Sequence, residues 1–254
     1  MPLDAVDGGY EVTIGPDVCS GVGWLFGGWG LGLAVDAVRT ATGRPVRDLS
    51  LSFVRPIASG ARLTLSYKGL AAGRNLGHGG ITVHDDDAVA LSGLAVVGTP
   101  SGDLVVRDTP PPAPPPEFCP ERPYAAGPGT GTSVLLDVRS AGEESDVGVH
   151  SRILLWARLR CEVPDEVRLA VVSDHVPFLL KRVFPDITRF STVNSSLRLL
   201  GGPVAEWVLL DVTLVALAGR LATGRVALWS DGTTLVGVAE QSTWLSGGSA
   251  SRPG

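Results

Sequence analysis

The chain has 254 residues, of which 44% are hydrophobic and 19% charged, and its formal net charge is −5. This composition excludes an intrinsically disordered chain, which would need fewer apolar and more charged residues. The acidic balance argues against a nucleic-acid-binding surface, because such a surface needs a basic stripe. We therefore expect no nucleic acid among its partners.

The cysteines and the uncharged stretches indicate a compartment. The three cysteines form no CxxC pair and are too scattered for a disulfide framework, so we expect a reducing, cytoplasmic location. Residues 18–35 are uncharged but contain six glycines and are flanked by Asp17 and Asp36. We predict a buried helix there and no membrane span.

A proline-rich segment divides the sequence into two halves. Residues 109–116 read TPPPAPPP, which favours an extended linker because proline lacks an N–H group and fixes φ. We predict an N-terminal domain over residues 1–108, a Pro/Gly-rich linker over 109–130, a C-terminal domain over 131–247 and a flexible tail over 248–254.

Both halves predict one long helix together with a run of strands. In the first half, the helix covers residues 29–42 and ends at Gly43, which suits a left-handed cap. Alternating apolar residues predict strands at 46–55, 61–69, 76–84 and 88–97, with an acidic turn at Asp85-Asp86-Asp87.

In the second half, the helix covers residues 167–183 and a turn falls at Asp231-Gly232. The predicted strands are 133–138, 153–159, 191–199, 207–217, 220–229 and 235–244. The repeated order indicates a duplication of an α+β unit in which a curved antiparallel sheet wraps one helix.

Several common catalytic motifs do not occur. The sequence has no GxSxG elbow, and the glycines at 27–30 fit neither a dinucleotide fingerprint nor a P-loop. The four histidines are isolated, and His84 beside the acidic turn is better explained as part of a solvated hairpin. We therefore expect no metal and no cofactor.

Three polar residues interrupt apolar elements of the second half. They are Asp174 in the predicted helix, Thr192 in a strand and Gln241 in the last strand. Each has an ordinary explanation, as a helix cap, a strand former and an outward-facing residue. Together they could bind one water, with Asp174 accepting its proton and Thr192 and Gln241 directing it.

The order of short motifs resembles that of the double-hotdog acyl-CoA thioesterases of the acyl-CoA thioesterase II type. The motifs are Phe26-Gly27-Gly28, Ser52-Phe53-Val54-Arg55-Pro56, Gly73-Arg74-Asn75-Leu76, Ser173-Asp174, Thr192-Val193-Asn194-Ser195-Ser196, Glu206-Trp207-Val208-Leu209, Ala218-Gly219-Arg220 and Val238-Ala239-Glu240-Gln241. The resemblance covers nearly the whole chain outside the linker.

The resemblance implies a tandem hotdog, in which the two sheets form one continuous sheet. It also implies that Asp174, Thr192 and Gln241 are the catalytic trio of a hydrolase that cleaves an acyl-CoA or a related acyl thioester. Arg47 and Ser50 stand where the family has histidines, and Asn194-Ser195 where it has Asp-His, which bears on acyl specificity. Uncovered sheet edges also suggest association into homo-oligomers.

Further residues are expected around the reacting group. Trp24, Phe26 and Trp29 are candidates to line an acyl slot between helix and sheet, and the N–H groups of Gly28 and His175 are oxyanion candidates. Candidates for phosphate contacts, by charge alone, are Arg55, Arg74 and Arg198. Two alternatives stay open: a non-hydrolytic acyl-binding protein, and an enzyme acting on a carrier-protein-bound biosynthetic intermediate.

Overall fold

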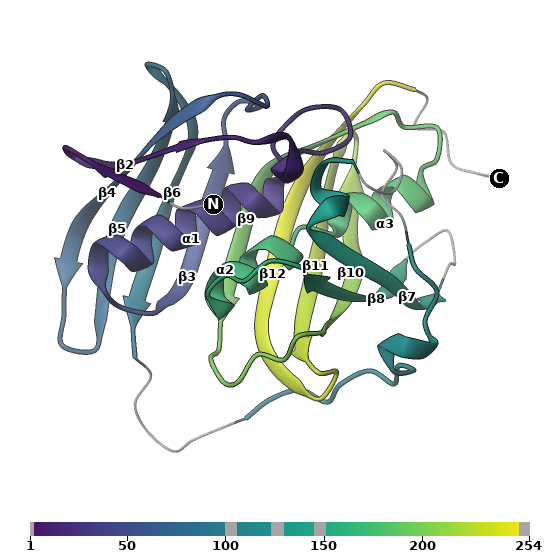
Figure 1. Cartoon of the computed structure of the whole chain (residues 1–254). Coiled ribbons are helices and arrows are strands. Elements are labelled where there is room, and N and C mark those ends of the chain that lie inside the picture. Colours follow the sequence, from purple (N-terminus) through teal and green to yellow (C-terminus); the bar gives the residue numbers. More distant parts are fainter. Residues whose placement is uncertain (1–2, 100–105, 123–129, 145–150, 249–254) are drawn as a thin grey trace.

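One antiparallel sheet forms the back of the molecule, and the helices lie on its inner side (Figure 1). The computed structural model describes residues 3–99, 106–122, 130–144 and 151–248. Within these residues the sheet has 12 strands in the order β1-β2-β4-β5-β6-β3-β9-β12-β11-β10-β8-β7.

The first half contributes six strands to this sheet. They are β1 (Asp4–Val6), β2 (Gly9–Thr13), β3 (Val46–Phe53), β4 (Arg62–Ala72), β5 (Leu76–Asp85) and β6 (Ala88–Gly98). The strands predicted from alternation are confirmed, and so is the turn between β5 and β6, where Asp86 has a φ of 51°. The hairpin of β1 and β2 was not predicted, because both strands are short.

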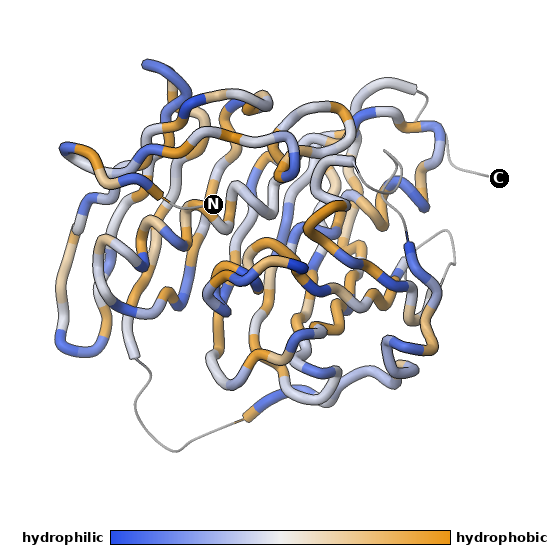
Figure 2. The backbone as a smooth tube through the Cα atoms, in the orientation of Figure 1, coloured by the Kyte–Doolittle hydropathy of each residue, from blue (hydrophilic) through white to orange (hydrophobic). Residues whose placement is uncertain are grey.

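The second half contributes the other six. They are β7 (Leu136–Glu144), β8 (Arg152–Leu159), β9 (Arg189–Leu199), β10 (Val208–Ala218), β11 (Leu221–Ser230) and β12 (Thr234–Ser246). The expected strand at 133–138 is wrong at its start, where Gly131–Val134 form a 3-10 turn. Asp231 and Gly232 both have positive φ values and make the predicted turn. Hydrophilic residues gather at these hairpin turns (Figure 2).

The two halves meet where β3 pairs with β9. Leu49 lies opposite Leu197 and Ser50 opposite Ser196 in an antiparallel ladder. In both halves the strand order outward from this seam is the same, β3-β6-β5-β4 and β9-β12-β11-β10. The structure thereby confirms the predicted duplication and the continuous sheet of a tandem hotdog.

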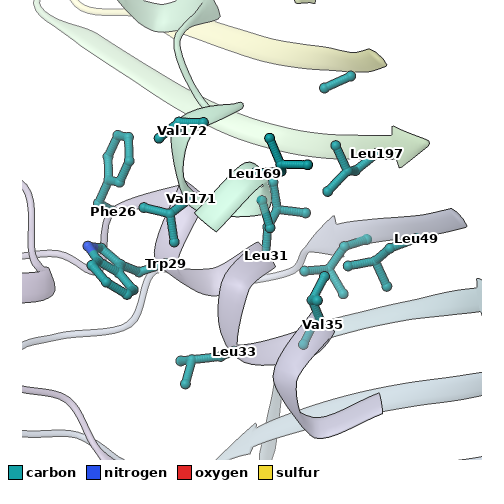
Figure 3. Packing of buried hydrophobic residues seen from close by; sticks show 14 of the residues in the cluster. Phe26, Trp29, Leu31, Leu33, Val35, Leu49, Leu169, Val171, Val172 and Leu197 are labelled. Atoms are coloured by element: carbon teal, nitrogen blue, oxygen red, sulfur yellow. The ribbon is translucent and has the colours of Figure 1, made fainter. Parts of the chain in front are cut away.

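Helix α1 (Gly27–Thr42) begins two residues earlier than predicted and ends at Gly43. The φ of Gly43 is 63°, and its N–H group donates to the carbonyl of Arg39, as expected of a left-handed cap. Leu31 and Val35 of this helix point toward Leu49 on the sheet (Figure 3). This contact places the helix across the sheet of the first half.

The long helix predicted at 167–183 is wrong, because the chain forms two helices there. They are α2 (Asp165–Val172) and α3 (Val176–Val183), separated by Ser173-Asp174-His175. Pro177 in the first turn of α3 has no N–H group and its ring would clash with the preceding turn of a continuous helix. The proline was visible in the sequence and is the signal that marks the break.

Glycines bring α1 and α2 into close contact. A Cβ atom at Gly28 would lie 2.2 Å from the carbonyl oxygen of Val171, and one at Gly32 would lie 2.9 Å from the Val171 side chain. Gly30, in contrast, faces Phe53 of the sheet. The glycine-rich sequence of α1 therefore serves helix–helix packing as well as the expected approach of the sheet.

The proline-rich segment lies across a second apolar cluster on the other side of the sheet. Trp156 donates its indole N–H to the carbonyl oxygen of Pro114 at 2.8 Å, and Arg139 donates to that of Pro116 at 2.8 Å. The Arg139 guanidinium also lies 5.0 Å from the ring centre of Trp207. Residues 109–116 thus form a strap that covers the aromatic outer face of the second half.

Two further features concern membrane-spanning helices and metal ligands. None of the helices in the described residues is long and apolar enough to cross a membrane. The described part of the chain also contains no group of three potential metal-ligating side chains.

Candidate active site

The N-terminus of α1 is capped by a residue from the other half of the chain. Phe26, the N-cap residue, provides no side-chain hydrogen bond. Instead, Gly28 donates its backbone N–H to Oδ2 of Asp174 at 2.8 Å, across 146 residues of sequence. The positive end of the helix dipole and the N–H group both favour the ionised form of this carboxyl.

The break between α2 and α3 is what brings Asp174 to this position. Ser173 ends α2 with its N–H bonded to the carbonyls of Leu169 and Ala170, and α3 starts only at Val176. The chain between the helices carries the carboxylate to α1, whereas a continuous helix would have fixed its direction by the helical period. The failed helix prediction and the position of the carboxylate therefore have one cause.

Gln241 joins two further elements to the carboxylate. Its Nε2 donates to Oδ1 of Asp174 at 2.5 Å and to Oγ1 of Thr192 at 2.7 Å. Only the N–H₂ end of the amide can face an ionised carboxylate, which fixes the orientation of the amide. The three residues named from the sequence thus form one hydrogen-bonded cluster of side chains from β9, β12 and the α2–α3 junction.

Burial sets the electrostatics of this cluster. Asp174 is 4% exposed and Gln241 is 2% exposed. Burial raises the pKa of Asp174 from its ordinary value of 3.8 to about 6, against the hydrogen bonds from Gln241 and Gly28, which lower it. A carboxyl with a pKa near 6 is mostly ionised at neutral pH and is still a good proton acceptor.

The hydrogen bonds of Gln241 differ from the expected ones. Both N–H hydrogens of its amide are used on Asp174 and Thr192, so they cannot direct a water as predicted. Thr192 accepts from Gln241, which leaves its own O–H free to donate. Oε1 of Gln241 is buried and has no hydrogen-bond partner in the described part of the chain. Gln241 therefore holds the other two groups in place.

The expected oxyanion groups are corrected by the structure. The N–H of Gly28 is bonded to Asp174, and that of His175 donates to the carbonyl of Ser173 at 3.0 Å. The N–H of Gly27, the first residue of α1, has no hydrogen-bond partner among the described residues. Sequence reasoning selected the neighbouring glycine because it could not tell which N–H Asp174 would occupy.

The side chain of His175 is fully buried and packs against aromatic rings. Burial lowers the pKa of its ring to about 4, so the ring is neutral at physiological pH. The ring lies edge-on to Phe26 at 6.3 Å between ring centres and 5.0 Å from Phe178, and Nδ1 is 2.8 Å from the carbonyl oxygen of Val172. This ring therefore anchors the α2–α3 junction that carries Asp174.

A cavity of about 290 Å³ is lined from α1 by Trp29 and Leu33, which lie on the side of the helix away from Leu49 of the sheet (Figure 3). Its lining includes Trp29 and Leu33 from α1 and the segment leading into α2, the full set being Trp29, Gly32, Leu33, Asp36, Glu162, Val163, Pro164 and Val167. Of the three predicted slot residues, only Trp29 lines it. Trp24 is 45% exposed, and Phe26 packs on His175.

The three arginines predicted to contact phosphate differ in their ion pairs and in their exposure. Arg198 forms ion pairs with Asp48 at 3.5 Å and with Glu240 at 3.7 Å. Its neighbours Leu197 and Leu199 face the helices, so Arg198 lies on the opposite face of the sheet from Asp174. The expectation for Arg198 is therefore wrong. Arg55 and Arg74 are both exposed.

Comparison with family models identifies the chain. Residues 16–98 match the model of the acyl-CoA thioesterase N-terminal domain, and residues 108–245 match that of the acyl-CoA thioesterase C-terminal domain. The chain belongs to the acyl-CoA thioesterase family. As a member of that family it is a thioester hydrolase, and its tandem hotdog is the expected fold.

Solved structures agree with this family. A Novosphingobium aromaticivorans protein proposed to be a thioesterase is 30% identical, with a TM-score of 0.86 over 96% of this chain and 98% of that one. Acyl-CoA thioesterase II from Mycobacterium marinum is 19% identical, with a TM-score of 0.77 over 98% of both chains. A hotdog protein from Alicyclobacillus acidocaldarius is 17% identical, with a TM-score of 0.85 over 98% and 97%. A comparison with curated proteins gave no match.

Proposed function

We propose that this acyl-CoA thioesterase cleaves its substrate by direct attack of a water molecule held between Asp174 and Thr192. The observation that carries the proposal is the Gln241 amide, which binds both groups at once inside a buried cluster. A carboxylate and a hydroxyl fixed in this way can accept a proton from a water and donate to its lone pair.

The proposed reaction needs one proton acceptor and one polarising group. The water gives a proton to Asp174 while its oxygen attacks the thioester carbonyl carbon. The carbonyl oxygen, which becomes negative, accepts from the N–H of Gly27 at the positive end of α1. The C–S bond then breaks, and the thiolate takes up the proton held by Asp174, which restores the carboxylate.

The surroundings favour this route over a covalent acyl-enzyme. Ser173, the hydroxyl adjacent to Asp174 in sequence, donates to the carbonyl oxygen of Ala170 at 2.8 Å and is thereby turned away from the carboxylate. An activated serine nucleophile would instead be hydrogen-bonded to its base.

The cavity beside Trp29 is the proposed place of the acyl chain. Trp29 follows Gly28, whose N–H group holds Asp174, so the cavity and the cluster lie on adjoining residues of α1. Most of its lining is apolar, as an acyl chain requires. The thiol-bearing part of the substrate would then lie outside this cavity.

The function is tested by release of free thiol from acyl-CoAs of short, medium and long chain length. Asp174→Asn is expected to lower kcat by about 100-fold or more, because it removes the general base. Asp231→Asn, at the exposed β11–β12 turn, is the control and should keep wild-type activity, since asparagine tolerates a positive φ.

The outcomes separate the alternatives. Acyl-CoA binding without thiol release from the wild type would favour the non-hydrolytic acyl-binding protein. Hydrolysis of an acyl group bound to acyl carrier protein, but not of acyl-CoA, would favour an enzyme that acts on a carrier-protein-bound biosynthetic intermediate. An Asp174→Asn variant as active as the wild type would rule out the proposed base.

A further inference from the structure

Thr243 is a buried hydroxyl beside the cluster that the proposed reaction does not use. It follows Gln241 by two residues on β12, so both side chains face the helices. Thr243 is 0% exposed, and its Oγ1 has no hydrogen-bond partner in the described part of the chain. In the β9–β12 ladder it lies directly opposite Thr192.

A second unpartnered atom belongs to Gln241, two residues from Thr243 on the same face of β12. Nε2 of Gln241 is 2.7 Å from Oγ1 of Thr192, so the amide lies against the residue that pairs with Thr243. The register of this ladder shifts by one residue between Ser242 and Thr243, which is a β-bulge beside the pair. Oε1 of the same amide is buried and without a partner among the described residues. A free acceptor and a free hydroxyl therefore lie on one face of β12, on residues that both neighbour Thr192.

Two buried polar atoms without partners are costly, and proteins usually satisfy such atoms with an ordered water. A water fits the chemistry of this pair, because it can donate to the carbonyl oxygen of the amide and accept from the threonine hydroxyl. It would be distinct from the water that attacks the thioester, which is expected on the other side of the amide.

We propose that Thr243 is a positioning residue that binds one ordered water and, through it, fixes the amide of Gln241. The inference rests on the proposed function, since it is the Asp174–Thr192 pair that the amide aligns. The N–H₂ end of the amide is held by these two residues. The water holds the opposite end, so the plane of the amide is set from both sides.

The test compares Thr243→Val, which keeps the shape and removes the hydroxyl, with Thr243→Ser, which keeps the hydroxyl. Thr223→Val on β11 is the matched control, because Thr223 pairs with Ser242 on the other face of the sheet. Thiol release is measured as kcat and KM over pH 5–8, together with the melting temperature of each variant.

We expect Thr243→Val to lower kcat by about 5- to 10-fold with KM nearly unchanged, the effect of losing one hydrogen bond. The acid limb of its pH profile should move to higher pH, because a looser Gln241 lowers the pKa of Asp174 less. Thr243→Ser should restore both values, and Thr223→Val should match the wild type.

A Thr243→Val enzyme with wild-type kcat and pH profile would overturn the proposal and leave Thr243 a packing residue. If that variant does not fold, Thr243→Ala against Thr243→Ser makes the same comparison. A high-resolution crystal structure gives a readout independent of activity: a water within hydrogen-bond distance of Thr243 Oγ1 and Gln241 Oε1 supports the inference, and a dry site overturns it. An inactive wild type would instead refute the proposed function.

Discussion

Replacing Asp174 with asparagine should stabilise the fold at neutral pH while it removes activity. The pKa of this carboxyl rises from 3.8 to about 6 on folding, because burial penalises the charge. At about 1.4 kcal/mol per pH unit, this rise corresponds to about 3 kcal/mol. Asparagine has no charge to bury, and its Oδ1 can still accept from Gly28. A 180° turn of the Gln241 amide lets Oε1 accept from the new Nδ2 and from the Thr192 hydroxyl, so no donor is left facing a donor.

The sign of the effect follows from proton binding. Between pH 3.8 and about 6 the folded wild type binds more protons at Asp174 than the unfolded chain does, so its stability falls as pH rises. The cost is complete above about pH 6 and absent below pH 3.8. The advantage of the Asp174→Asn variant over the wild type should therefore grow with pH and then level off.

Urea denaturation of both proteins at pH 4 and pH 7.5 measures this directly. The difference in unfolding free energy should be about 2 to 3 kcal/mol larger at pH 7.5. The pKa of His175, lowered to about 4, acts in the opposite direction over nearly the same range, but it is present in both proteins and cancels in the comparison. A difference independent of pH would show that no buried carboxylate is ionised there, and the reasoning would fail.

Three further outcomes are expected. Because Asp174 must be ionised to act as a base, kcat/KM should fall about tenfold per pH unit below about pH 6. The rate is measured as CoA released, by chromatography, and a flat pH profile would contradict this expectation. Gly27→Ala should lower kcat at least tenfold without unfolding the protein, because a Cβ atom there would lie 2.5 Å from the Asp174 carboxylate. Gly30→Ala is the control and should retain most activity, because a Cβ atom at Gly30 would approach only side chains. Trp156→Phe, which loses the bond to the Pro114 carbonyl, should cost about 1 kcal/mol and speed limited proteolysis within the strap; unchanged cleavage would mean that the strap is held by other contacts.

Periodicity and turn chemistry account for most of the secondary structure that the sequence predicted. Strict alternation predicted the long strands, and the acidic turns at Asp86 and Asp231 have the left-handed backbone that such turns require. Gly43 ended α1 as predicted. The N-terminal hairpin was missed, because three to five residues are too few to show a period.

The sequence by itself determined that the chain folds as two similar α+β halves, because those signals lie within a few neighbouring residues. It also supplied the identities of Asp174, Thr192 and Gln241. Only the tertiary structure decided that β3 pairs with β9, that Asp174 of one half caps the N-terminus of α1 in the other, and that the Gln241 amide donates both its N–H groups to Asp174 and Thr192. All of these contacts join residues far apart in sequence: the first two link the two halves, and the third links two strands and a helix junction within the second half, so they form only when the chain packs in three dimensions.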